Sequence, residues 1–328
     1  MPSAIGTSTV SSLSRQTIMP EIVDATYDSN ILFYRLVRAN KKVVQGGTHI
    51  EVPIQYARPN NAQAYSGFDP LNSAPFDVVK NARFDWKQYG ALVTIDGLTM
   101  IKTDTPEAIA NFVKTQFELT KTDFCHVLGT DLYAGNASDP DRLTGLAQAV
   151  SASGTYGEIS HTNTYWQSKM DTTTNLAGLS FDLLQTVFSN LTVGREAPTL
   201  MIGRRAVYNK LWSLIYGTGG GNVQITVPAG GADEILASGG FTNILFNNVP
   251  VVVDSQVDVS SGSGSTASNG KLYMLNENWF ELAVSPRADM ALEDFVTPHD
   301  QDAMTAKILW AGELICKNPR LQGAFTAL

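Results

Sequence analysis

The segment that most constrains this chain runs from Tyr56 to Asp77, "YARPNNAQAYSGFDPLNSAPFD", between two stretches with the pattern of β-strands. A hairpin connection needs only a few residues, whereas this one has twenty-two, with three prolines and no helical period. Strands of about nine residues on each side would carry it roughly 30 Å. Because a two-stranded ribbon is marginally stable alone in water, the sequence predicts a long arm that must lie on another surface.

The stretch before this arm, "GGTHIEVPIQY", alternates between apolar and polar residues. Its apolar side carries Ile50, Val52, Ile54 and Tyr56. A period of two residues predicts a strand with one covered face. Pro53 has no N–H to donate, so we expect an edge strand, or a strand that is paired on one side only.

The stretch after the arm, "FDVVKNARFDWKQYGALVTIDG", changes phase partway along. Its apolar residues lie first at even and then at odd positions: Phe76, Val78, Ala82, Phe84 and Trp86, followed by Tyr89, Ala91, Val93 and Ile95. A shift by one residue moves every side chain to the other face of a strand. We therefore expect a bulge or bend near Lys87 and Gln88.

A long helix is predicted from Thr105 to Gly129. Thr105 can cap it, Pro106 suits the first helical position, and Gly129 can end it. One apolar stripe follows the helical period: Ile109, Phe112, Val113, Phe117, Thr120, Phe124, Val127 and Leu128. About twenty-three helical residues would span roughly 35 Å, the length of a spine rather than of a small-domain helix.

The rest of the chain mixes helices and strands irregularly. Helices are expected within residues 20–40, 180–191 and 204–215, strands at 199–202, 246–257 and 271–276, and a last long strand from Asp302. Glycine clusters surround a small strand at 216–231, and residues 260–270 have the composition of a flexible turn. Because the even rhythm of a doubly wound sheet is missing, the fold class is α+β.

Charged residues make up only 16% of the chain, against roughly 25% in ordinary soluble domains, which favours a surface covered by other subunits. The formal net charge of −8 argues against a dedicated DNA-binding protein. Residues 1–50 are the exception, since five cations face three carboxylates there. This end is either a solvated helix face or a surface that faces something anionic. Its cations are Arg15, Arg35, Arg38, Lys41 and Lys42.

Targeting signals are missing from the sequence. The opening "MPSAIGTSTVSSLSRQ" has no apolar run preceded by positive charge, so we expect no signal peptide, and an ordered tail of this kind would need something to hold it. No window approaches the ~20 apolar residues of a membrane span. Cys125 and Cys316 lie in apolar patterns and are expected to be buried free thiols of a cytosolic protein.

Motifs that carry chemistry are weak throughout. The loop "YGTGGGNVQ" lacks the Lys-Ser/Thr pair that meets phosphates, and Cys125 and His126 would point about 100° apart on a helix. "HDQD" at 299–302 and "NASDPD" at 136–141 fit polar loops better than cation sites. We therefore expect no enzyme, no cofactor and no metal.

The order of these segments resembles the major capsid proteins of tailed bacteriophages, whose fold is also that of encapsulin nanocompartments. "VVQGGTHIEVPIQY" and "ALVTIDG" are similar to the strands that enter and leave the family's extended loop. "TPEAIANFVKTQFELTKTDFCHVLG" resembles its spine helix. "PTLMIGRRAVYNKL", "FNNVPVVVDSQV" and "KLYMLNENWFELAVS" resemble elements of the domain at the capsomer centre, and "AKILWAGELICKNPRLQGAF" the closing strands.

The resemblance implies a division of the chain. It comprises an N-terminal arm, an extended β-hairpin loop, a peripheral domain with a sheet and a long spine helix, and a central α/β axial domain. The ranges are 1–44 for the arm, 45–97 for the loop, 98–178 with 300–317 for the peripheral domain (spine helix 106–128), and 179–299 with 318–328 for the axial domain.

The same resemblance implies a structural role. Pentamers and hexamers of the chain would form an icosahedral shell around phage double-stranded DNA, assembled in the host cytoplasm, with scaffolding, portal and decoration proteins as possible further partners. The loop would clasp a neighbouring subunit. Its contact residues would be Tyr56, Arg58, Tyr65, Phe68, Phe76, Phe84 and Trp86, and the basic residues facing DNA would be Arg35, Arg38, Lys41 and Lys42.

Three alternatives stay open at this point. Some members of the family cross-link a loop lysine to a neighbour's asparagine; Lys80 and Lys87 are candidates, but the sequence identifies no partner and we expect no cross-link. An encapsulin-like compartment would have the same fold around an enzyme cargo. A soluble enzyme with a site assembled from distant residues would form a small discrete species instead.

Overall fold

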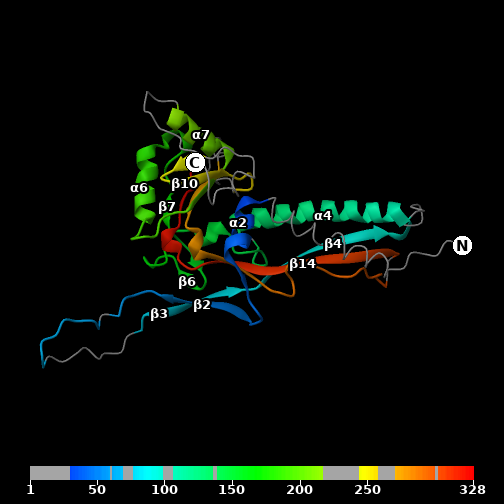
Figure 1. The fold of residues 1–328 in the computed structure, drawn as a ribbon, viewed down its shortest axis with the longest axis horizontal. Helices are drawn as coiled ribbons and strands as arrows, with labels where there is room; N and C mark the ends of the chain where they lie inside the picture. Colours follow the sequence, from blue (N-terminus) through cyan, green and yellow to red (C-terminus); the bar gives the residue numbers. More distant parts are fainter. Residues whose placement is uncertain are drawn as a thin grey trace.

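The computed structural model describes residues 30–59, 61–68, 77–98, 106–135, 139–216, 244–257, 270–299 and 302–328. The molecule is elongated (Figure 1). A long helix and two long strands extend to one side of a body of sheets and shorter helices, and a β-hairpin leaves the body at another point. This mixed architecture confirms the α+β class expected from the sequence.

The first sheet has five strands and is organised around one of them, β14. Its members are β1 (Lys41–Val43), β4 (Lys87–Asp96), β12 (Phe280–Val284), β13 (Ala291–Leu292) and β14 (Ala303–Cys316). β14 pairs with β4 from Ala303 to Gly312 and with β12 from Gly312 to Cys316. The predicted long strand is present, and one of its faces is buried at Met304, Ala306, Ile308, Trp310, Leu314 and Cys316.

Helix α4 (Pro106–Ala134) packs against β4 along this sheet. Val113 and Phe117 of the helix share a buried cluster with Val93 and Ile95 of the strand. The ring of Phe117 meets that of Phe295 edge-on, with 6.0 Å between the centroids. The predicted spine helix is therefore present, and its apolar stripe joins it to the strand pair.

Gly129 does not end this helix, contrary to the prediction from the sequence. α4 continues to Ala134, and Gly135 follows with a φ of +72°. A Cβ on Gly129 would lie 1.4 Å from Oε1 of Gln256 and 2.6 Å from Nδ2 of Asn30. The glycine is needed for close packing within the helix rather than for a turn at its end.

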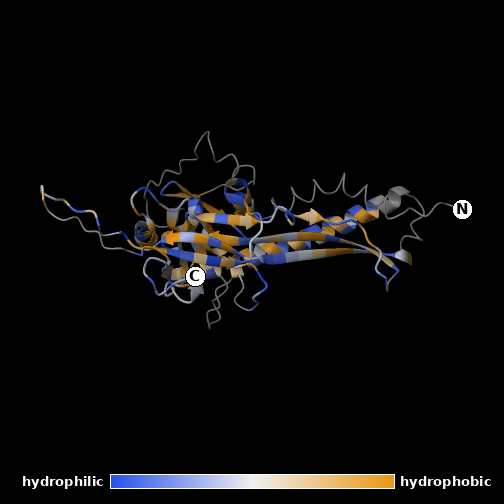
Figure 2. Ribbon diagram, turned by 90° about the horizontal axis from the view of Figure 1, so that it is seen from below, coloured by the Kyte–Doolittle hydropathy of each residue, from blue (hydrophilic) through white to orange (hydrophobic). Residues whose placement is uncertain are grey.

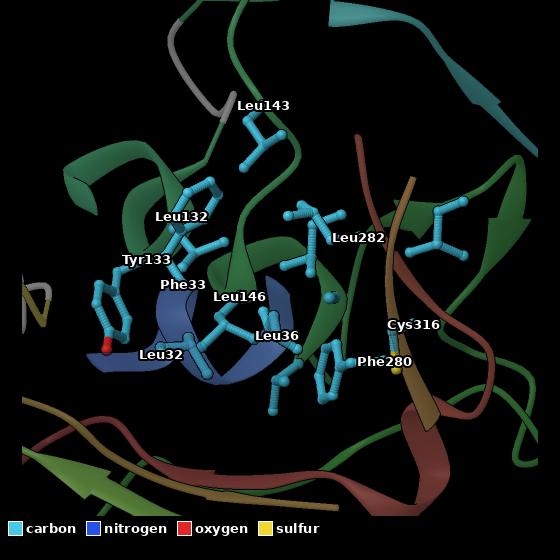
Figure 3. Close-up of a cluster of buried hydrophobic side chains, with 14 of the residues drawn as sticks. Leu32, Phe33, Leu36, Leu132, Tyr133, Leu143, Leu146, Phe280, Leu282 and Cys316 are labelled. Atoms are coloured by element: carbon cyan, nitrogen blue, oxygen red, sulfur yellow. The ribbon is translucent and has the colours of Figure 1, made fainter. Parts of the chain in front are cut away.

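Asn30 begins helix α2 (Ile31–Asn40) as its N-cap, because its Oδ1 accepts the N–H of Phe33 at 2.9 Å. Leu32, Phe33 and Leu36 of this helix are buried. They enter the largest core cluster together with the end of α4, the short helix α5 (Leu146–Ala149), and strands β12 and β14 (Figure 3).

The second sheet has six strands in the order β7-β15-β11-β8-β10-β9. Their bounds are β7 (Lys169–Asp171), β8 (Leu200–Gly203), β9 (Ile244–Phe246), β10 (Val249–Val253), β11 (Leu272–Leu275) and β15 (Gly323–Phe325). Helices α6 (Phe181–Leu191) and α7 (Arg205–Tyr216) share a buried apolar cluster with this sheet. Ser180 caps α6, because its side-chain oxygen accepts the N–H of Leu183.

The segment expected as one strand over residues 246–257 is instead a hairpin, β9 and β10. Asn247 and Asn248 join the two strands with φ of +48° and +67°. Positive φ at both central residues is typical of a type I′ turn, and asparagine tolerates it better than most residues. The other small elements are β5 (Thr155–Tyr156), β6 (Ile159–Ser160), η1 (Leu176–Gly178), η2 (Glu277–Trp279) and η3 (Pro319–Leu321).

Sheet membership divides the chain differently from the ranges expected above. β12 and β13 lie within 179–299 but pair with β14, and β7 lies within 98–178 but pairs with β15. Several expectations fall outside the described residues: the cap at Thr105, the glycine clusters at 217–231, most of the turn at 260–270, and parts of the "NASDPD" and "HDQD" loops.

A close approach of two backbone segments gives a first prediction. Gly145→Ala would place a Cβ 2.5 Å from the carbonyl oxygen of Asp131 and 2.7 Å from N of Gly135. Neither atom can rotate away, so we expect the free energy of unfolding to fall by about 1–3 kcal/mol. Urea unfolding measures this loss.

Gly90→Ala is the matched control, because its Cβ would make an ordinary contact of 3.4 Å with Leu309 on an exposed strand position. It is expected to change the stability by no more than about 0.5 kcal/mol. Equal losses of stability in the two variants would show that Gly145 is not tightly packed against Asp131 and Gly135.

Candidate functional site

The hairpin arm is built by β2 (His49–Gln55) and β3 (Val79–Asp85). The strands are antiparallel with seven residue pairs, from His49 opposite Asp85 to Gln55 opposite Val79. Among the described residues these two strands pair only with each other. The expectation that Pro53 marks a strand paired on one side is therefore confirmed.

The base of the arm packs on its own chain. Ile50, Ala82 and Phe84 are buried, and the ring of Phe84 lies edge-on to Tyr156 with 5.1 Å between centroids. The N–H of Arg83 donates to the carbonyl of Gly157 at 3.2 Å. Phe84 is only 5% exposed, so its expected place on the intersubunit surface is corrected: it belongs to the subunit's own core.

The outer face of the arm is charged. Arg83 pairs with Glu51 across the strands at 3.0 Å and lies 4.0 Å from Glu158. His49 Nδ1 lies 2.7 Å from a carboxylate oxygen of Asp85. The arm is thus apolar towards the body and polar towards solvent at its base, as the alternation in the sequence predicts.

Trp86 is the residue that separates β3 from β4, and it lies one residue before the predicted bend. Its Nε1 donates to the carbonyl of Gly47 at 3.0 Å, and its ring packs partly buried against the main core. Beyond it the buried residues change phase, since Ala82 and Phe84 precede it and Val93 and Ile95 follow it. Trp86 fixes the junction at which the chain leaves the arm's strand pair for the first sheet.

The distal part of the arm extends away from the body (Figures 1 and 2). Tyr56 is still anchored there, because its Oη donates to the carbonyl of Asp77 at 2.6 Å and its ring lies 5.5 Å from that of Tyr165. Farther out, Arg58 is exposed, Tyr65 is 62% exposed and Phe68 is fully exposed. Phe76 lies outside the described residues.

A groove lies between α4 and β4, where β4 pairs only with β14 among the described residues. It encloses about 320 Å³ and is lined by Tyr89, Gly90, Ala91, Leu92, Thr120, Asp123, Phe124 and Val127. Leu92 is 57% exposed and Val127 is 40% exposed. Val127 therefore lies at this groove and not on the buried stripe to which the sequence pattern assigns it.

The four basic residues expected to face DNA are mostly paired. Arg35 makes two contacts of 2.7 Å with Glu277, Lys41 lies 2.5 Å from Asp289, and Lys42 lies 3.7 Å from Glu281. Arg38 is exposed, and its Nη1 lies 3.2 Å from the hydroxyl of Tyr34. Glu277 and Asp289 offset the charges of Arg35 and Lys41, whereas Glu281 is shared between Lys42 and Lys317.

Within the described parts of the chain, the fold brings together no set of residues suited to catalysis or to metal binding. Cys125 is buried while its neighbour His126 is exposed. No group of three His, Cys, Asp or Glu residues there is placed to hold a metal ion. Among the helices that are described, none is long and apolar enough to cross a membrane.

Of the cross-link candidates, Lys80 lies over the ring of Tyr56 and Lys87 donates to the carbonyl of Pro140.

Three buried carboxyl groups were not expected from the sequence: Glu313, Asp131 and Asp254. Glu313 of β14 is fully buried, and burial raises its pKa to about 8. Asp131 at the end of α4 is 1% exposed and lies 2.8 Å from Arg142. A signal for the first was present, because a single carboxylate within the apolar run "ILWAGELIC" is unusual in a buried strand.

Scans of the sequence against family models and curated proteins give no match. Solved structures do match. The capsid asymmetric unit of cyanophage A-1(L) aligns over 95% of this chain and 94% of its own, with a TM-score of 0.61 and 15% identity. The holo-SrpI encapsulin complex of Synechococcus elongatus PCC 7942 aligns over 89% and 86%, with a TM-score of 0.55 and 10% identity.

The capsid of an empty GTA particle aligns over 89% of this chain and 96% of its own, with a TM-score of 0.54 and 11% identity. All three alignments run through nearly the whole length of both chains, so they compare complete folds rather than single motifs. At these identities the likeness concerns the backbone architecture alone. The chain therefore has the fold that these phage capsid and encapsulin proteins share.

Proposed function

We propose that this chain is a major capsid protein that assembles as pentamers and hexamers into an icosahedral shell around phage double-stranded DNA. The observation that carries the proposal concerns the arm. Its base packs on its own chain, whereas its distal aromatic residues are exposed. Tyr65 and Phe68 lie exposed at the far part of the arm. The likeness of the whole fold to capsid and encapsulin structures supports the same role.

A sister copy is the partner that we propose for the distal arm. Exposed apolar side chains on an extended arm are stabilised when another surface buries them. The groove between α4 and β4 offers such a surface, since Leu92 and Val127 are exposed there. An arm that meets a different surface on the next copy is a heterologous contact, and such contacts close into rings around rotation axes. Repetition of the contact on every subunit would make the closed particle persist.

The contact with DNA is proposed for the exposed part of the basic region. Arg38 is exposed, and the side chain of Lys42 keeps 59% of its surface accessible. Arg35 and Lys41, by contrast, are largely enclosed by their carboxylate partners. Contacts of this kind are made with phosphates and carry no sequence information, as packaging requires. Assembly in the host cytoplasm, and any scaffolding, portal or decoration proteins, belong to the same proposal.

Sizing of the purified protein tests the proposal directly. Sedimentation velocity and negative-stain microscopy are expected to show closed shells, or pentamers and hexamers, rather than a monomer. A homogeneous monomer or dimer at all concentrations would instead support the soluble enzyme.

An encapsulin-like compartment is the second candidate, since the holo-SrpI encapsulin complex is among the matching structures. The contents of purified shells separate the two functions. Nuclease-resistant DNA inside the shell supports the capsid, whereas a co-purifying protein cargo without DNA supports the compartment.

A further inference from the structure

Glu313 occupies a buried position that the contact surfaces described above do not use. Its Oε1 accepts the N–H groups of Thr144 at 2.9 Å and of Leu314 at 3.1 Å. Its Oε2 has no hydrogen-bond partner within the part of the chain that the structure describes. A buried oxygen without a partner disfavours the charged form of the group much more than the neutral form.

The partner of Glu313 lies in segment 140–144, which connects the end of α4 to α5. Four contacts hold this segment to its surroundings: Lys87 Nζ to the Pro140 carbonyl (2.6 Å), Arg142 Nη1 to Asp131 Oδ1 (2.8 Å), Leu143 N to Tyr89 Oη (2.7 Å) and Thr144 N to Glu313 Oε1 (2.9 Å). The acceptors and donors outside the segment belong to β4, α4 and β14. The segment therefore joins the helix end to the strand pair.

Few charges face Glu313. Burial favours the neutral form and outweighs the N–H groups of Thr144 and Leu314 and the cation Lys87 of β4, which favour the ionised form. The phenols of Tyr89 on β4 and Tyr156 on β5 lie within the field of its carboxyl group. The other carboxylates in this region form ion pairs. Asp131 of α4 pairs with Arg142, and Glu281 of β12 pairs with Lys317.

We propose that Glu313 is a protonation-controlled latch that, in its neutral form, holds segment 140–144 and the end of α4 against the β4–β14 pair. Ionisation places a negative charge on the buried Glu313 carboxylate, whose Oε2 accepts no hydrogen bond within the described part of the chain. Release of the segment lets water reach the carboxylate. The device lies within one subunit and goes beyond the shell function, so the two proposals fail independently.

The direction of the pH dependence follows from the two states of the carboxyl group. Burial raises the pKa of Glu313 to about 8 in the closed latch, against 4.5 for a hydrated glutamate. The closed state therefore binds the proton more tightly, and opening becomes more favourable as the pH rises. Between about pH 4.5 and 8 the opening constant increases about tenfold per pH unit, and above pH 8 it levels off because both states are ionised.

Hydrogen–deuterium exchange of the full-length protein tests this latch. Peptides that cover 140–144 are compared from pH 5 to 9, after correction for intrinsic exchange, in the wild type and in Glu313→Gln. The glutamine keeps the volume and an oxygen acceptor but cannot ionise. We expect protection in the wild type to fall by several hundredfold between pH 5 and 8, and protection in the variant to stay flat.

Tyr89→Phe provides the control for a purely structural role. It removes the acceptor for the N–H of Leu143, and burial already raises the pKa of Tyr89 above its usual range. In this variant the protection of segment 140–144 should be lower by the same factor at every pH, and its dependence on pH should have the slope of the wild type. A flat profile in the wild type, the same slope in Glu313→Gln, or a lost slope in Tyr89→Phe would each overturn the proposal.

Discussion

Replacing Tyr65 and Phe68 together by serine is expected to leave a folded subunit that no longer forms closed particles. Both side chains lie on the distal arm, 62% and fully exposed, so they contribute little to their own fold. The free energy of unfolding should change by no more than about 0.5 kcal/mol. In a shell, burial of each ring would contribute about 1.5–3 kcal/mol, and every subunit would lose that contribution.

Negative-stain microscopy and sedimentation velocity measure the loss of particles, and thermal unfolding checks the fold. Val296→Ser is the matched control, because it removes an apolar side chain that is also 62% exposed but lies beside β14 rather than on the arm. The control should assemble normally. Intact particles from the double variant would remove the distal arm from the assembly contact.

Phe84→Ala is expected to lower the free energy of unfolding by about 3–5 kcal/mol. Its ring is 5% exposed, lies edge-on to Tyr156 and fills the space in front of Gly157. Removal leaves a cavity between the arm and the body, so the arm should also become mobile at its base.

Urea unfolding measures this loss, and Val79→Ala in the same strand is the control. Val79 is 51% exposed, and its truncation should change the stability by less than about 1 kcal/mol. If Phe84→Ala were no more destabilising than Val79→Ala, the base of the arm would not be fixed by its own chain. In that case the arm would depend on a neighbour along its whole length.

The local elements of the fold could be predicted because their residue periods are strong. The alternation through Ile50, Val52 and Ile54 and the change of phase around Trp86 both appear in the burial of the folded chain. The long helix likewise follows from its apolar stripe and from Pro106. Each of these features is decided by residues close together in the sequence.

The arrangement of the strands could not be predicted in the same way. β15 lies between β7 and β11, although more than forty residues separate it from either. Glycine has a similar ambiguity, since Gly129 is needed where α4 packs against Asn30, whereas Gly135 has the positive φ that follows the helix end. Nothing local in the sequence distinguishes these two roles.

The candidate contact surface was predictable in position but not residue by residue. The resemblance assigns the aromatic residues of both the strand and the connection to the contact surface, yet Phe84 is buried on its own chain and Phe68 is fully exposed. Only the docking of the arm's base against Gly157 separates the two groups. For the same reason, the carboxylate partners of Arg35 and Lys41 lie more than two hundred residues away and leave no local pattern.

Both sheets depend on strands that are made late during synthesis. β14 is the strand to which β4, β12 and β13 pair, and β15 sits inside the six-stranded sheet. A nascent chain on the ribosome therefore exposes two unfinished sheets until residues 303–325 have emerged, although domains generally begin to fold from the N-terminal side. A chain that ends upstream of β14 lacks a member of each of these sheets and cannot complete either.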